Sequence, residues 1–149
     1  MKKGLVCKRI LDLRPYIPGK PIEEVKRELG LKEIIKLASN ETSVGPSPLA
    51  IEAIKKEIEN IHLYPEGSSR PLREKIAHKL KVDKEMIIVG NGEDDIIDLI
   101  RMAFINEGDE VITGEITFPA YETATKIMGG KTIPVKFKNY TYDLEEIAR

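Results

Sequence analysis

The chain has 149 residues, of which 41% are hydrophobic but only 5% aromatic, so any core is mainly aliphatic. Its 24 basic and 25 acidic residues give a net charge of -1. Nucleic-acid and membrane-surface proteins usually carry a one-sided basic excess, so this balance argues against both kinds of partner. The single cysteine, Cys7, excludes an internal disulfide and fits a reducing cytoplasm.

The beginning of the chain predicts neither a signal peptide nor a membrane anchor. Residues 1–16 contain only a short apolar patch that Lys8 and Arg9 interrupt, and no segment approaches the roughly 20 apolar residues of a membrane span. Pro15, Pro18 and Gly19 then predict an extended arm over the first twenty residues.

Apolar residues at helical spacing, with glycine or proline at their ends, predict helices along the rest of the chain. Four segments that are apolar or rich in β-branched residues predict strands. The helices are expected at 22–29, 48–61, 72–81, 94–105 and 118–128, with one more beginning near 142, and the strands at 34–38, 86–90, 110–113 and 132–137. Pro134 lies in the last of these strands and indicates an edge position or a special contact.

Strands that alternate with helices predict an α/β fold with a parallel or mixed sheet. A sheet of about three strands would leave one edge and much apolar helix surface uncovered. We therefore expect the chain to be part of a larger domain.

The segment MIIVGNGEDDIIDLI predicts a buried strand that turns through Gly90 and Gly92 into a helix. The first turn of a helix has unpaired backbone N–H groups and a positive dipole end, so such a turn can bind a phosphate. A purely structural turn is the alternative, because acidic residues such as Glu93, Asp94 and Asp95 commonly occupy a first helical turn.

Six segments, taken in order, resemble histidinol-phosphate aminotransferases and the other pyridoxal-phosphate-dependent aminotransferases of class I/II. These segments cover most of the chain from Leu13 onwards. They are LRPYIPGKP, KLASNET..GPSP, YPEGSSRPLREKIA, VGNGEDDIIDLI, GDEVITGEITFPAY and GGKTIPV.

This resemblance implies part of the pyridoxal-phosphate-dependent transferase fold of type I, a mixed-sheet large domain with an N-terminal arm. Residues 1–45 would form the arm and part of the small domain, and residues 46–149 the first part of the large, cofactor-binding domain. It also implies a cytoplasmic homodimer that binds pyridoxal 5'-phosphate. The implied reaction, in histidine biosynthesis, transfers an amino group from L-histidinol phosphate to 2-oxoglutarate, giving imidazole-acetol phosphate and glutamate.

The resemblance assigns roles to six residues. The backbone N–H groups of Gly92, Glu93 and Asp94 would bind the cofactor phosphate, and Phe118 would stack on its ring. Tyr64 would reach the phosphate in the partner subunit, and Asn40 would flank the substrate. From the residues alone, Phe118 could equally fill a core, Tyr64 could be a loop tyrosine and Asn40 a capping residue.

Two departures from the family pattern concern the site. Glu93 stands where relatives have serine or alanine, so its carboxylate would oppose a phosphate unless it points away. Thr42-Ser43-Val44-Gly45 replaces the usual Asn-Pro-aromatic-Gly, so an aromatic side chain near the substrate is lost. These departures concern the affinity for the phosphate and the identity of the substrate.

No lysine of this chain lies in the motif that forms the Schiff base with the cofactor. We therefore assign no catalytic residue and expect the chain alone to be inactive. His62 and His78 lack metal-ligand spacing, so no metal is expected either.

Other functions remain open on the sequence. A threonine-phosphate decarboxylase of the same superfamily shares much of the pattern, and another class I/II aminotransferase is a further alternative. A non-catalytic dimerisation or binding remnant is the alternative of another class. A mononucleotide-binding domain is disfavoured, because GNGEDD has neither the GxGxxG spacing nor the lysine of a P-loop.

Overall fold

The computed structural model describes residues 4–149, so the first three residues of the predicted arm lie outside the described residues. The chain divides into two compact units. Unit 1 comprises the chain up to Tyr16 together with Ile88–Arg149, and unit 2 comprises Ile17–Ile87. The predicted division into residues 1–45 and 46–149 stays a prediction. Within residues 4–149, no helix combines the length and the apolar character needed to cross a bilayer.

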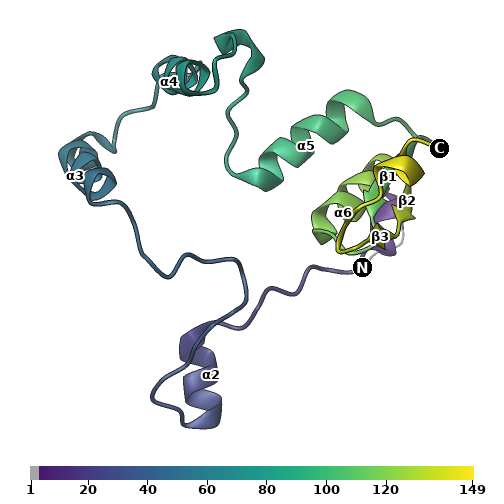
Figure 1. Ribbon diagram of the computed structural model, residues 1–149, viewed down its shortest axis with the longest axis horizontal. Helices are drawn as coiled ribbons and strands as arrows, with labels where there is room; N and C mark the ends of the chain where they lie inside the picture. Colours follow the sequence, from purple (N-terminus) through teal and green to yellow (C-terminus); the bar gives the residue numbers. More distant parts are fainter. Residues whose placement is uncertain (1–3) are drawn as a thin grey trace. The chain divides into compact units, whose positions relative to one another are not determined.

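Unit 1 is built around a parallel strand pair, β1 (Glu110–Gly114) and β2 (Lys131–Val135), which α6 (Pro119–Met128) connects (Figure 1). In the register of this pair, Ile112 lies opposite Ile133. Parallel neighbours need such a crossover connection, and here a helix supplies it. The predicted strand at 110–113 and the helix at 118–128 are therefore confirmed.

Two further helices pack on α6 in unit 1. They are α5 (Glu93–Phe104), which confirms the helix predicted at 94–105, and the short α1 (Lys8–Leu11). The buried side chains of the unit include Ile97 from α5, Ala124 and Thr125 from α6, and Val135 from β2. The core that positions the candidate site is thus small and mainly aliphatic.

An antiparallel hairpin follows β2, formed by β3 (Phe137–Lys138) and β4 (Thr141–Tyr142), and α7 (Leu144–Ile147) follows the hairpin. The rings of Phe137 and Tyr142 meet edge to face, with centroids 5.0 Å apart. Within residues 4–149, unit 1 therefore contains one parallel pair and one separate antiparallel pair.

Unit 2 contains the helices expected before residue 82. They are α2 (Ile22–Leu29), α3 (Pro48–Glu57) with the 3-10 turn η1 (Ile58–Asn60), and α4 (Arg70–Leu80), followed by the 3-10 turn η2 (Lys84–Met86). Gly30 ends α2 with φ 65°, in the left-handed region that glycine enters without strain, as the sequence predicts.

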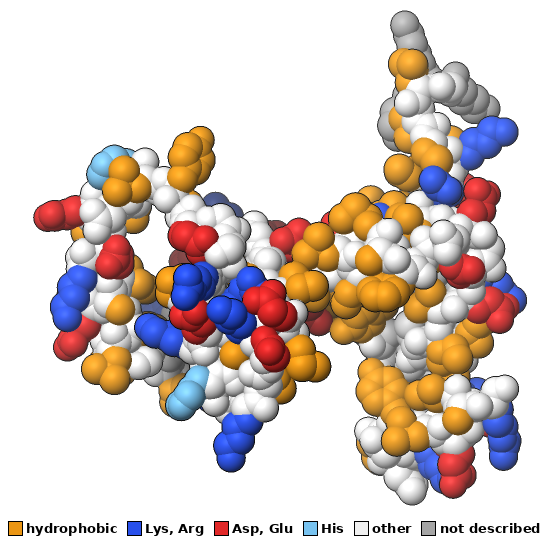
Figure 2. Space-filling view, turned by 90° about the horizontal axis from the view of Figure 1, so that it is seen from above, with side chains coloured by type: hydrophobic (Ala, Val, Ile, Leu, Met, Phe, Trp, Pro, Cys, Tyr) orange, Lys and Arg blue, Asp and Glu red, His pale blue; other side chains and the backbone are white. Residues whose placement is uncertain are grey.

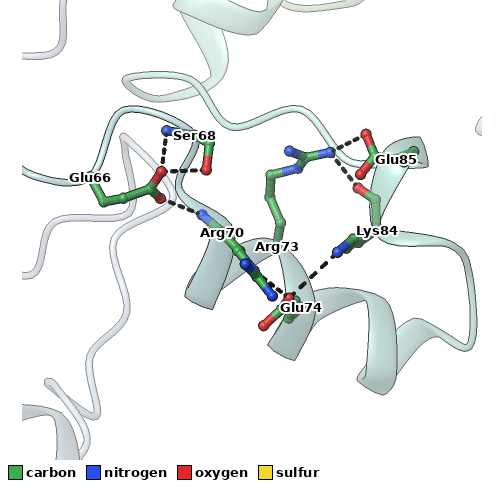
Figure 3. A network of polar contacts seen from close by, with 7 residues as sticks. All are labelled: Glu66, Ser68, Arg70, Arg73, Glu74, Lys84 and Glu85. Atoms are coloured by element: carbon green, nitrogen blue, oxygen red, sulfur yellow. Dashed lines mark hydrogen bonds and ion pairs between the residues drawn. The ribbon is translucent and has the colours of Figure 1, made fainter.

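Polar contacts join α4 to η2 and to the loop before α4 (Figure 3). Arg73 Nη2 donates to the carbonyl of Lys84 at 2.9 Å and to Glu85 at 3.0 Å. Glu74 pairs with Arg70 at 2.8 Å and with Lys84 at 3.6 Å. These contacts fix the N-terminal end of α4 relative to the chain that follows the helix.

Several expectations from the sequence are wrong. Residues 34–38 form no strand, and the segment 86–90 comprises the end of η2 followed by extended backbone that pairs with no strand of residues 4–149. Ile88 in this segment is 73% exposed. An apolar run becomes a strand only where another backbone supplies the ladder, and none of the described residues does so.

Two smaller corrections concern the ends of unit 1. The strand expected at 132–137 is divided at Lys136, so that Phe137 belongs to the hairpin and not to β2. The predicted extended arm contains the one-turn helix α1. Pro134 lies in β2, whose only partner within residues 4–149 is β1. Because proline has no backbone N–H, this position either faces the unpaired side of the strand or lacks one hydrogen bond of the ladder.

Acidic and basic side chains are interspersed on the face that Figure 2 shows, and no large area of one sign appears there. This distribution agrees with the net charge of -1.

Candidate functional site

The turn before α5 has a backbone conformation that favours glycine strongly. Gly92 has φ 91° and ψ 179°, a region that is essentially confined to glycine. No side chain caps the helix, and the N–H groups of Glu93, Asp94 and Asp95 have no acceptor within residues 4–149. These donors lie at the positive end of the helix dipole, so the turn can receive an anion.

Two of the three carboxylates in the first turn of α5 are engaged by other groups. Asp95 Oδ2 accepts a hydrogen bond from the backbone N–H of Asn91 at 2.8 Å. Glu93 Oε1 accepts one from the hydroxyl of Tyr121 at 3.2 Å. A Cβ at Gly90 would lie 2.9 Å from the same Asp95 oxygen, so glycine at that position leaves room for the turn.

Phe118 precedes α6 and lies between two tyrosines. Its ring meets that of Tyr16 edge to face at 6.2 Å and that of Tyr121 at 6.1 Å. Phe118, Tyr16 and Asp94 all line one groove of about 600 Å³. The structure therefore brings the predicted ring-stacking residue and the predicted phosphate turn to the same region of unit 1.

The other two predicted residues, Asn40 and Tyr64, belong to unit 2. Asn40 has φ 50° in a turn with Ser39 at φ 70°, and an ion pair of 2.8 Å between Lys36 and Glu41 spans this turn. Asparagine tolerates this left-handed conformation better than most residues. Tyr64 is fully exposed.

The loop that follows Tyr64 is ordered by one carboxylate (Figure 3). Glu66 accepts hydrogen bonds from the backbone N–H and hydroxyl of Ser68 and from the backbone N–H of Arg70, the last at 2.9 Å. The hydroxyl of Ser68, followed by the N–H of Arg70, lowers the pKa of the Glu66 carboxyl. Glu66 thus serves as the cap at the start of α4, where Ser69 makes no side-chain cap.

The sequence did not single out Tyr16, Tyr121 or Asp95 as site residues. The three-residue spacing of Phe118 and Tyr121 on a predicted helix places both on one face, which is a usable signal. The contact of Tyr16 with Phe118 joins residues about 100 positions apart, and no local pattern predicts it.

The residues of unit 1 fit a phosphorylated aromatic cofactor. Within residues 4–149, the N–H donors at the start of α5 have no acceptor, and the Glu93 carboxylate accepts from Tyr121 and from none of them. Phe118 offers an aromatic surface in the groove that Asp94 also lines. No group of three or more metal-binding side chains is found within residues 4–149.

Comparisons with known proteins show the family of the chain. The sequence model of the family described as aminotransferase class I and II matches residues 32–149. The chain belongs to this family of aminotransferases. It is 48% identical over 139 residues to the histidinol-phosphate aminotransferase of Moorella thermoacetica, and 52% identical over 140 residues to that of Caldicellulosiruptor saccharolyticus.

These matches cover 93% and 94% of this chain but only 36% and 39% of the two relatives. Thus the chain spans less than half of the length of the curated relatives that it matches. For this chain, we therefore treat the activity, substrates and partners of those longer proteins as proposals.

Solved structures show the same fold. The histidinol-phosphate aminotransferase of Sinorhizobium meliloti, crystallised with pyridoxal-5'-phosphate, superposes with a TM-score of 0.81 at 23% identity, covering 95% of this chain and 38% of that one. The aspartate aminotransferase of Thermotoga maritima gives a TM-score of 0.67 at 22% identity, covering 96% and 41%. The predicted fold class, part of the type I fold of pyridoxal-phosphate-dependent transferases, is confirmed.

Proposed function

We propose that this chain forms the phosphate-binding and ring-binding part of the pyridoxal 5'-phosphate site in an aminotransferase that acts on L-histidinol phosphate and 2-oxoglutarate, in histidine biosynthesis. The observation that carries the proposal is the identity of 48% and 52% to two histidinol-phosphate aminotransferases over more than nine-tenths of the chain. In this proposal, the uncapped start of α5 binds the cofactor phosphate and Phe118 contacts the cofactor ring.

Each predicted residue has one task in this proposal. Gly92 provides the turn, and the N–H groups of Gly92, Glu93 and Asp94 donate to the phosphate. Phe118 holds the cofactor ring flat by stacking. When bound, the cofactor supplies an electron-withdrawing ring that stabilises negative charge at the substrate α-carbon.

The resemblance assigns roles to two further residues, Asn40 and Tyr64, which both belong to unit 2. Asn40 lies in a turn held in a left-handed conformation and flanks the substrate. Tyr64, fully exposed in this chain, binds the cofactor phosphate of a partner subunit. This role requires a homodimer, which we propose together with a cytoplasmic location.

The complete product of the gene that encodes this sequence provides the test. We expect it to form glutamate from 2-oxoglutarate when L-histidinol phosphate is supplied, and to do so far more slowly with L-histidinol, which lacks the phosphate. Release of carbon dioxide from threonine phosphate without glutamate formation would instead identify the decarboxylase. If the protein neither catalyses a reaction nor binds the cofactor, the result would support the alternative of a non-catalytic binding module.

A further inference from the structure

One side chain of unit 1 contacts two of the residues assigned to the cofactor. Tyr121 lies in the first turn of α6, three residues after Phe118. Its hydroxyl donates to Glu93 Oε1 at 3.2 Å, and its ring meets that of Phe118 edge to face with an interplanar angle of 90°. Tyr121 therefore links the start of α5 to the residue before α6.

The hydrogen bond engages the Glu93 carboxylate, which would otherwise compete with a phosphate for the N–H groups at the start of α5. Glu93 is the first residue of α5, and a carboxylate in this turn is attracted by the same N–H groups and dipole that would bind a phosphate. A glutamate near a helix start often folds back to accept from a backbone N–H. In this chain Glu93 accepts from Tyr121, and from no backbone N–H of residues 4–149.

The position of Tyr121 is itself fixed by the core. Its carbonyl accepts a hydrogen bond from Thr125 Oγ1 at 2.8 Å, and Thr125 is only 1% exposed. The ring is half-buried against Phe118. The hydroxyl is thus presented to Glu93 from a helix that the buried face of unit 1 holds in place.

We propose that Tyr121 is a positioning residue that holds the Glu93 carboxylate away from the N–H groups at the start of α5, so that these donors remain available to a phosphate monoester. The proposal rests on the proposed function, because it needs a phosphate at this turn. It also explains how a phosphate-binding turn accommodates the carboxylate of Glu93. The hydrogen bond from Tyr121 to Glu93 raises the pKa of the Tyr121 phenol, so the hydroxyl remains a donor at neutral pH.

The test compares Tyr121→Phe, Glu93→Gln and the double variant in the complete gene product. Tyr121→Phe removes only the hydroxyl and keeps the edge contact with Phe118. Equilibrium binding is measured for pyridoxal 5'-phosphate and for pyridoxal, which lacks the phosphate. Circular dichroism confirms that each variant is folded.

We expect Tyr121→Phe to weaken pyridoxal 5'-phosphate binding about twofold to fivefold, the size of one charge acting at a helix end. Binding of pyridoxal should not change. In the Glu93→Gln background the same substitution should have no effect on either ligand. An equal loss for both ligands, or a loss that persists with Glu93→Gln, would show that Tyr121 acts on the ring or the fold and would overturn the proposal.

Two further outcomes separate this proposal from the proposed function. If the wild-type protein binds pyridoxal 5'-phosphate no better than pyridoxal, the phosphate site fails and the role of Tyr121 fails with it. If the preference exists but is unchanged by Tyr121→Phe, only the role of Tyr121 is contradicted. A titration of tyrosine absorbance without cofactor adds a direct check, because Glu93→Gln should lower the pKa of Tyr121, and an unchanged pKa would mean that the hydrogen bond is absent.

Discussion

Gly114 and Gly92 are required for different physical reasons. At Gly114, a Cβ atom would collide with the Phe137 ring and lie 2.8 Å from Tyr142 Cε1. At Gly92, a Cβ would meet nothing within 4 Å, but the backbone has a conformation that other residues rarely adopt. The first glycine is needed for space and the second for conformation.

Gly114→Ala should lower the free energy of unfolding by about 1–3 kcal/mol, because the added methyl group overpacks the aromatic pair of the hairpin. Chemical denaturation would measure the change. Gly67→Ala is the matched control, since its Cβ has no neighbour within 4 Å and its backbone is not left-handed. Equal stability of the two variants would contradict the close contact of Phe137 and Tyr142 with Gly114.

Glu66 gives the loop before α4 a dependence on pH. The pKa of the Glu66 carboxyl is lowered in the folded chain. Its stabilising contribution to the loop is therefore complete above the ordinary pKa of a glutamate, and it is lost as the pH falls through the folded pKa. We expect hydrogen-exchange protection of the Ser68 and Arg70 amides to fall on acidification, and to be low at all pH values in Glu66→Gln. Glu57→Gln is the control and should leave both amides unaffected, because the Glu57 carboxylate accepts from the Asn60 side chain and not from this loop.

At the scale of elements, the start of α5 combines a glycine turn, three acidic residues and N–H groups that have no acceptor in the described part of the chain. A local pattern predicts the helix and the turn, because helical hydrogen bonds join residues four positions apart. The direction of each carboxylate depends on partners elsewhere: Asp95 turns back to Asn91, whereas Glu93 reaches Tyr121 in α6. The second contact keeps the Glu93 carboxylate away from the N–H groups that would bind an anion.

Gly92→Ala should destabilise the protein by about 1–3 kcal/mol through backbone strain alone. It should also weaken binding of pyridoxal 5'-phosphate more than binding of pyridoxal, because the strained turn moves the phosphate donors. Thermal denaturation and ligand titration would measure the two effects, with Gly67→Ala as the control. A variant of unchanged stability would contradict the conformation assigned to Gly92.

At the scale of the whole molecule, apolar side chains remain uncovered, as the sequence predicts. On α5, Ile100 is 51% and Phe104 is 76% exposed, and the extended segment before Gly90 has no strand partner within residues 4–149. Surfaces of this kind usually pack against further polypeptide. The relatives are more than twice as long as this chain, which agrees with that expectation.

The 149-residue chain should give no single modified lysine when it is mixed with pyridoxal 5'-phosphate and reduced with borohydride. A lysine that captures the aldehyde selectively needs a site that activates it, and no lysine of this chain lies in the Schiff-base motif of the family. Peptide mapping by mass spectrometry should therefore find a low, scattered modification. Stoichiometric labelling of one lysine would contradict the absence of a catalytic residue.

The sequence by itself determined the helices α2 to α6, the β1–α6–β2 segment and the family, because apolar periodicity, terminal glycines and short motifs are local properties. Only the tertiary structure decided that residues 87–90 have no ladder partner in the described chain, that Phe137 leaves β2 for a hairpin, and that Tyr121 binds Glu93. A ladder or a side-chain contact joins segments far apart in sequence, and its formation depends on which backbone or side chain lies opposite.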